Sequence, residues 1–179
     1  MKVVSLAKLL ALPILLCDVP AAHTVHAASD APPRISVVFV KPDSFTDVGY
    51  VEGERGERAI LLELQRFIVD TASRYVPKPT RLEIKITDID LAGDFELFRG
   101  PHFDHVRVNK SIYPPRIALE FRVTGSDDQT TKEGVCTLTD PDYQLRVVYP
   151  REDYLRHEKE LLRDWLRGEF ATLKSAKAK

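Results

Sequence analysis

Two segments of this chain alternate apolar and polar residues so strictly that each predicts a strand with one buried and one solvated face. They are residues 81–87 and 116–124. Strand side chains point to opposite faces with a period of two, so each segment presents one apolar row. A turn at 125–128 follows the second segment, and residues 130–139 return with Cys136 on the expected core face. The last two segments therefore predict a hairpin in an antiparallel sheet with one face open.

Two further segments have the period of amphipathic helices. Residues 57–76 place apolar side chains at spacings of 3, 4, 7 and 8, which makes one stripe, and Pro77 ends the pattern. Residues 150–173 carry a second stripe, and Pro150 suits a first helical position. Both stripes need an apolar surface to cover.

The remaining strand signals are shorter. Residues 35–40 are β-branched and apolar, which predicts a strand buried on both faces. Residues 105–111 predict a short strand through Val106 and Val108. The expected order is β-α-β-β-β-β-α, an α+β fold. We expect a mostly antiparallel sheet of four to five strands with two amphipathic helices packed on one face, formed by a single domain over 34–173.

The amino-terminal segment predicts an export signal. Lys2 and Lys8 precede an apolar run at 9–17, which is too short to span a bilayer, and Val25 and Ala27 offer small residues for cleavage. We therefore expect a signal peptide over 1–27, then a flexible leader over 28–33, and a basic, frayed tail at 174–179. The mature protein is predicted to be periplasmic or secreted, without stable membrane insertion.

Composition and motifs exclude several function classes. The chain has 26 basic and 27 acidic residues, a net charge of -1, so it carries no electrostatic footprint for nucleic acid. After removal of 1–27 only Cys136 remains, so no internal disulfide can form. Neither a phosphate-binding glycine motif nor a serine-hydrolase elbow is present, and no cofactor is predicted.

An acidic run is the first candidate site. Asp88, Asp90, Asp94 and Glu96 fall within nine residues, and oxygen-rich clusters suit Ca²⁺. The spacing does not match an EF-hand loop. The alternative is a strand end and turn whose carboxylates accept hydrogen bonds from backbone N–H groups. We keep Asp88 and Asp90 as candidate ligand-binding residues.

Two other groups complete the candidate list. Arg107, Tyr113 and Arg116 lie near Pro114 and Pro115 and are candidates for the rim of a ligand site, although ordinary surface charges beside a sheet edge explain them better. His102, Asp104 and His105 offer imidazole and carboxylate ligands of the kind that Zn²⁺ accepts. A structural zinc site needs four donors, and no convincing third and fourth ligand is near in the sequence.

Four stretches carry a resemblance to a known family. They are residues 36–47, 87–96, 113–117 and 154–166. In them the chain resembles a bacterial family of exported proteins, the domain of unknown function 3016. The resemblance implies export and one domain over the mature chain, and it carries no activity and no catalytic residue.

Two functional hypotheses follow. The sequence favours a non-enzymatic accessory or binding module of the cell envelope, which holds an envelope protein partner through a sheet edge or a loop. The alternative is a small metal-dependent or hydrolytic enzyme that uses the acidic run Asp88–Glu96 or the His102, Asp104 and His105 cluster. The sequence leaves the oligomeric state open.

Overall fold

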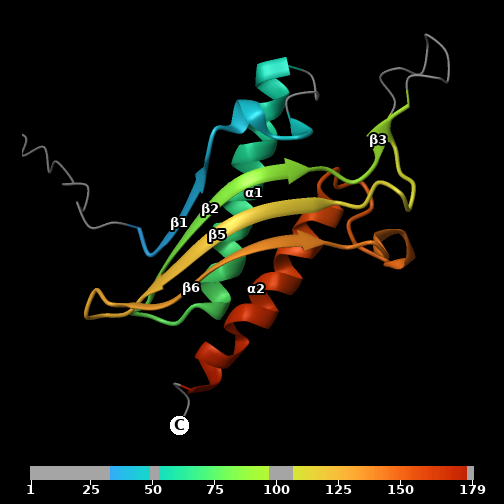
Figure 1. Ribbon diagram of the computed structural model, residues 1–179. Coiled ribbons are helices and arrows are strands. Elements are labelled where there is room, and N and C mark those ends of the chain that lie inside the picture. The colour runs from blue at the N-terminus through green and yellow to red at the C-terminus, as the bar shows by residue number, and fades with distance from the viewer. Residues whose placement is uncertain (1–32, 49–52, 97–106, 177–179) are drawn as a thin grey trace, which may run out of the picture. The chain divides into compact units, whose positions relative to one another are not determined.

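The computed structural model describes residues 33–48, 53–96 and 107–176, which lie in the second of the two units of the chain, Met1–Ala31 and Pro32–Lys179. The predicted signal peptide lies outside the described residues. The described part contains six strands and two α-helices (Figure 1). The strands are β1 (Ile35–Phe39), β2 (Arg81–Asp90), β3 (Asp94–Phe95), β4 (Arg107–Val108), β5 (Arg116–Thr124) and β6 (Thr130–Thr139). The α-helices are α1 (Gly53–Tyr75) and α2 (Arg156–Ala176).

Four strands form one sheet in the order β1-β2-β5-β6. Strand β1 runs parallel to β2, since the long helix α1 connects them, and the other two pairs are antiparallel. The predicted α+β class, with a mostly antiparallel sheet, is confirmed. The short strand expected over 105–111 appears as β4, and it pairs with β3 in a separate two-stranded ribbon.

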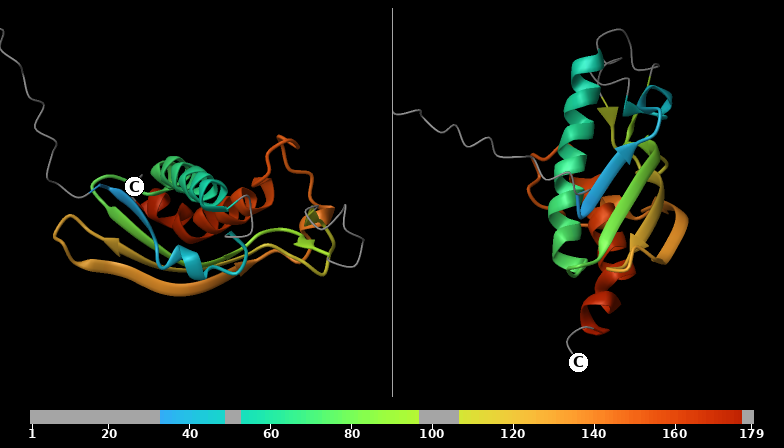
Figure 2. Two further views of the ribbon diagram at one scale, coloured as in Figure 1. Left: turned by 90° about the horizontal axis from the view of Figure 1, so that it is seen from above. Right: turned by 90° about the vertical axis from the view of Figure 1, so that its left-hand side faces the viewer.

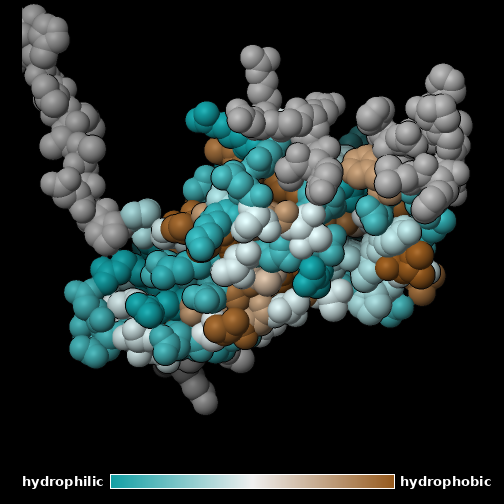
Figure 3. Space-filling view, turned by 45° about the horizontal axis from the view of Figure 1, so that its top comes forward, coloured by the Kyte–Doolittle hydropathy of each residue, from teal (hydrophilic) through white to brown (hydrophobic). Residues whose placement is uncertain are grey.

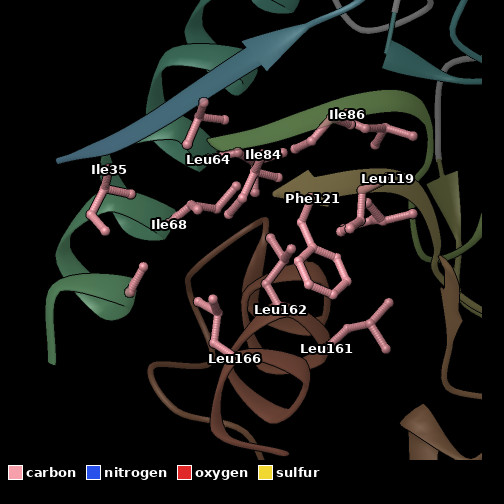
Figure 4. Close-up of a cluster of buried hydrophobic side chains, with 14 of the residues drawn as sticks. Ile35, Leu64, Ile68, Ile84, Ile86, Leu119, Phe121, Leu161, Leu162 and Leu166 are labelled. Carbon is pink, nitrogen blue, oxygen red and sulfur yellow. The ribbon is translucent and has the colours of Figure 1, made fainter. Parts of the chain in front are cut away.

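Both helices cover the same face of the sheet (Figure 2). The rows that the alternation predicted, Ile84 on β2 and Leu119 on β5 among them, are fully buried beneath the helices. Leu64 and Ile68 of α1 and Leu162 of α2 meet these rows from the other side (Figure 4). The two helix stripes and one sheet face therefore share one continuous core.

Strand β1 differs from its prediction. Ile35 and Val37 are buried, but Val38 is 44% exposed. Because β1 is the edge strand of a sheet that has helices on one face only, its second face meets solvent. The expectation that it is buried on both faces is therefore wrong.

Helix α2 begins later than predicted. Pro150 lies in the turns before the helix, and the first helical residue is Arg156. The side chain of Asp153 accepts a hydrogen bond from the backbone N–H of Leu155 at 2.9 Å, which closes an Asx turn just before the helix. The helix continues to Ala176, beyond the expected end near residue 173. No helix in the described ranges is both long enough and apolar enough to cross a membrane.

Gly134 marks a close approach between β6 and the core. It lies opposite Phe121 on β5, and a Cβ atom at position 134 would come within 2.8 Å of the Phe121 ring. That ring cannot easily move away, since Trp165 and Phe170 contact it edge-on at centroid distances of 5.6 and 5.8 Å. The missing side chain at Gly134 is therefore part of the packing of the aromatic cluster.

We expect Gly134→Ala to lower the free energy of unfolding by about 1–3 kcal/mol, because the added methyl group overpacks a filled site. Gly168→Ala is the matched control, since a Cβ at that position of α2 meets nothing within 4 Å. It should raise stability by about 0.5–1 kcal/mol, the usual gain for alanine over glycine inside a helix. Urea unfolding of both variants measures the difference, and equal effects would contradict this packing.

Candidate functional site

Polar side chains gather where β2 ends and β5 begins. The segment 45–48, the turn 91–93, the β3–β4 ribbon and the first turn of α2 contribute to this region, which we call the polar end of the sheet. The described ligand-binding candidates Asp88, Asp90, Arg107, Tyr113 and Arg116 all lie here, and their hydrogen bonds and ion pairs divide them into three groups.

A bulge in β2 forms the first group. Residues 82, 84 and 86 face the core, so unbroken alternation would turn residue 88 inward as well. The pairing with β5 shifts between Ile86 and Asp88, and Ile89 becomes the next buried residue. The extra residue therefore places Asp88 and Asp90 together on the outer face.

Arg116 lies between these two carboxylates. Its Nη2 is 3.2 Å from Asp88 Oδ2 and 3.5 Å from Asp90 Oδ2. Asp88 also accepts hydrogen bonds from the backbone N–H and the hydroxyl of Thr46, at 2.8 and 3.0 Å. Burial raises the pKa of Asp90, although the nearby Arg116 charge opposes this shift. In this group the carboxylates bind an arginine and a backbone donor.

The second group is a buried ion pair that the sequence did not reveal as a pair. Arg107 Nη1 is 2.6 Å from Asp47 Oδ2, and the two side chains are only 9% and 10% exposed. The same guanidinium donates to the carbonyl of Gly93 at 2.7 Å and lies 4.6 Å from the centre of the Phe95 ring. Asp47 accepts in turn from the backbone N–H of Leu91 at 3.2 Å. The pair joins segments that follow β1 and β2 to β4.

Glu158 extends this buried network from the first turn of α2. It is 1% exposed, and its Oε1 accepts a hydrogen bond from the backbone N–H of Ala92 at 2.7 Å. Its Oε2 is buried and has no hydrogen-bond partner in the described part of the chain. Burial raises the pKa of this carboxyl group. The spacing of Glu158 from Leu155 and Leu162 places it within the apolar stripe, a signal that the sequence analysis missed.

The third group stabilises the turn before the β3–β4 ribbon. Lys110 forms an ion pair with Glu96, and the Tyr113 hydroxyl lies 3.5 Å from Glu96 Oε1. The carbonyl of Tyr113 accepts a hydrogen bond from Gly93 N–H at 3.0 Å. Gly93 has a φ of +84°, a conformation that glycine adopts without a steric penalty. This group fixes the shape of the turn.

Some of the residues considered as metal ligands lie within the described ranges and others do not. His102, Asp104 and His105 lie outside those ranges. Among the described residues, no group of three or more histidine, cysteine or acidic side chains is arranged to hold a metal ion. Within the acidic run, Asp94 is exposed and accepts a hydrogen bond from the backbone N–H of Phe95 at 2.7 Å. The described carboxylates of this run contact backbone donors and basic side chains.

The open face and far edge of the sheet form a second polar surface. A shallow depression of about 250 Å³ lies between β2, β5 and β6 on the face away from the helices. Its residues are Glu83, Lys85, Glu120, Phe121, Arg122, Glu133, Gly134 and Val135. In the space-filling view, most of the described surface is hydrophilic and the hydrophobic patches are small (Figure 3).

Comparison with known proteins identifies the family. The family model described as "Protein of unknown function (DUF3016)" matches residues 33–168. The chain belongs to this family. No curated protein and no solved structure matches it. The match covers the sheet, α1 and most of α2, so the polar end and the open edge both fall within the family domain.

We expect Asp47→Asn to destabilise the fold by about 3–5 kcal/mol, because it leaves the buried Arg107 charge without its carboxylate. Asp128→Asn is the matched control, because Asp128 pairs with Arg81 on the surface, where the side chains are 74% and 38% exposed. An exposed pair contributes at most about 1 kcal/mol. Chemical denaturation of both variants gives the comparison, and similar losses would show that the Asp47 pair does not hold the polar end together.

Proposed function

We propose that this member of the family is a non-enzymatic binding module of the cell envelope that holds an extended polypeptide along the free edge of β6. The observation that carries the proposal is the difference between the two edges of the sheet. Strand β6 ends the sheet with ten residues, and no described strand lies beyond it. An exposed strand edge offers backbone hydrogen-bonding groups to an added strand.

The opposite edge is less accessible. Strand β1 has only five residues, and the side-chain amide of Gln65 on α1 lies 3.4 Å from the carbonyl of Val37. A helix side chain thus occupies a hydrogen-bonding group that an added strand would need. Of the two edges, β6 is therefore the better template.

The charges on the open face predict which sequence would bind. Glu83, Arg122 and Glu133 lie opposite one another on three neighbouring strands, so their charges alternate across the sheet. Arg122 Nε is 3.5 Å from Glu133 Oε2, and Glu133 is 65% exposed. A basic residue on an added strand would continue this alternation next to Glu133, since opposite charges stabilise cross-strand pairs.

The neighbouring row ends in an apolar residue. Lys85, Glu120 and Val135 lie opposite one another, and Val135 is 81% exposed. An apolar side chain on an added strand would cover Val135 and reach the rim of the 250 Å³ depression. The preferred partner therefore carries a basic residue and an apolar residue two positions apart, both on the open face.

The enzymatic alternative has less support. Asp88 and Asp90 contact Arg116, and Asp47 contacts Arg107. These contacts make the three carboxylates structural anchors for arginines rather than acids or bases directed at a substrate.

The binding proposal is tested by selecting linear peptides from a random library against the purified chain. We expect enrichment of sequences with a basic and an apolar residue two positions apart. Amide hydrogen exchange across residues 130–139 should slow when a selected peptide binds, because β6 gains a partner strand. The Glu133→Lys variant should weaken a selected peptide by about three- to tenfold, since an attractive pair becomes repulsive.

The Asp43→Lys variant serves as the control. Asp43 is an exposed acid after β1, away from β6, so this charge reversal should leave peptide affinity unchanged. Equal losses in the two variants would mean that only net charge attracts the peptide. Selected peptides without this spacing, or without protection of β6, would refute binding at this edge.

Export is the second part of the proposal and rests on the sequence of residues 1–27. Expressed with its own amino terminus in a Gram-negative host, the protein should be recovered from the periplasm or medium with Ala28 as its first residue. Replacing Ala27 with a bulky residue, as in Ala27→Phe, should leave the precursor uncleaved because cleavage requires a small residue there. Uncleaved wild-type chain in the cytoplasm would refute export.

A further inference from the structure

A basic depression lies beside the start of α2, away from the open face of the sheet. Its walls come from the 3-10 helix η4 (Tyr143–Leu145), from residues 146–151 and from the first turn of α2. Its volume is about 510 Å³, within the range of small-molecule sites. The lining residues that matter are Tyr143, Arg146, Val147, Arg151, Arg156 and His157.

The three arginines of this depression differ in their partners. Arg146 is neutralised by Asp140 at 2.9 Å and by Asp164 at 2.5 Å. Arg156 donates to the backbone carbonyls of Arg151 and Asp153, at 3.2 and 3.3 Å. The guanidinium of Arg151 lies 5.8 Å from the centre of the Tyr149 ring.

Arg151 and Arg156 therefore form no ion pair in the described ranges, although the Arg156 charge acts on the buried Glu158 carboxyl group. In the described ranges, no carboxylate lies within ion-pair distance of Arg151 or Arg156, and no described acidic residue lines the depression. Since unlike charges attract across a concave, partly desolvated surface, the depression favours an anion. The planar guanidinium group matches carboxylate and phosphate oxygens, and it can bind them through two hydrogen bonds.

The floor of the depression is held in place by the core. Tyr143 is 1% exposed, and its hydroxyl donates to the carbonyl of Lys110 at 2.9 Å. The His157 ring packs edge-on against Tyr143 with centroids 4.8 Å apart. Burial, and then the Arg156 charge, lower the pKa of His157 while Asp140 opposes this shift, which favours the neutral imidazole with one N–H group to donate.

We propose that this depression binds a small organic oxyanion, a carboxylate or phosphate that Arg151 and Arg156 clamp and whose apolar part lies against Val147. Val147 is 69% exposed and offers an apolar wall next to the two charges. The site shares no residue with the β6 edge, so it goes beyond the binding of an extended polypeptide. Binding of the anion requires only the folded chain and no metal or cofactor.

Calorimetric titration of the purified chain with phenyl phosphate, benzoate and inorganic phosphate tests the proposal. At least one aryl oxyanion should bind saturably, with one molecule per chain, and more tightly than inorganic phosphate, since only the aryl compounds cover Val147. The two aryl compounds distinguish a phosphate from a carboxylate ligand. Absence of saturable binding by both would overturn the proposal.

The Arg151→Gln and Arg156→Gln variants locate the site. Each should lose at least tenfold in affinity, because each removes one positive charge and its paired hydrogen-bond donors. Arg151→Gln is the cleaner variant, since its guanidinium makes no hydrogen bond in the described structure. Arg81→Gln is the matched control, because that arginine pairs with Asp128 where β2 begins, and it should bind like the wild type. Unchanged affinity in both site variants would place the anion elsewhere.

A spectroscopic readout separates binding at this site from a loss of folding. The pKa of the His157 imidazole, followed by NMR, should rise when the bound anion adds negative charge beside it. A His157 pKa that stays constant at saturating aryl oxyanion would refute occupation of the depression.

Discussion

The burial of one sheet face by two helix stripes is the constraint on which the rest of the structure depends. Fully burying a leucine or isoleucine contributes about 1.5–3 kcal/mol, whereas an exposed ion pair contributes at most about 1 kcal/mol. The buried apolar rows of β2 and β5 therefore decide how the helices lie, and the surface charges follow. Because both helices occupy one face, the other face and the β6 edge are left without a covering layer in the described structure.

The polar end shows how buried polar contacts fix segments outside the sheet in addition to apolar packing, since Phe45, Val48 and Leu91 of these segments also reach the core. Arg107 and Asp47 are almost buried, so their charges interact strongly, but each depends on its partner to offset lost hydration. Glu158 adds a helix side chain to the same network by accepting from the backbone of Ala92. These contacts make the position of α2 depend on the turn after β2, so the core and the polar end stabilise each other.

The fold class followed from period alone, because the alternation of 81–87 and 116–124 and the two helix stripes reflect a single shared core. The sequence period could not predict features that depend on a local irregularity or on contacts between residues distant in sequence. The bulge before Asp88 breaks the alternation without a glycine to mark it. Val38 looked buried because an apolar run cannot show that one face of its sheet is left uncovered. The Asp47–Arg107 pair spans 60 positions, which no local pattern encodes.

The same reasoning explains why the two proposed binding surfaces have different chemistry. At the polar end Arg107 and Arg116 each contact a carboxylate, and these ion pairs stabilise the fold. On the open face the rows end at β6 with Glu133 and Val135, and no described strand lies on their far side. Beside α2, Arg151 and Arg156 form no ion pair with a described carboxylate. In this domain, therefore, a binding surface differs from a structural cluster in having side chains that still lack a described neighbour or ion-pair partner. The presence of charged residues alone does not distinguish the two.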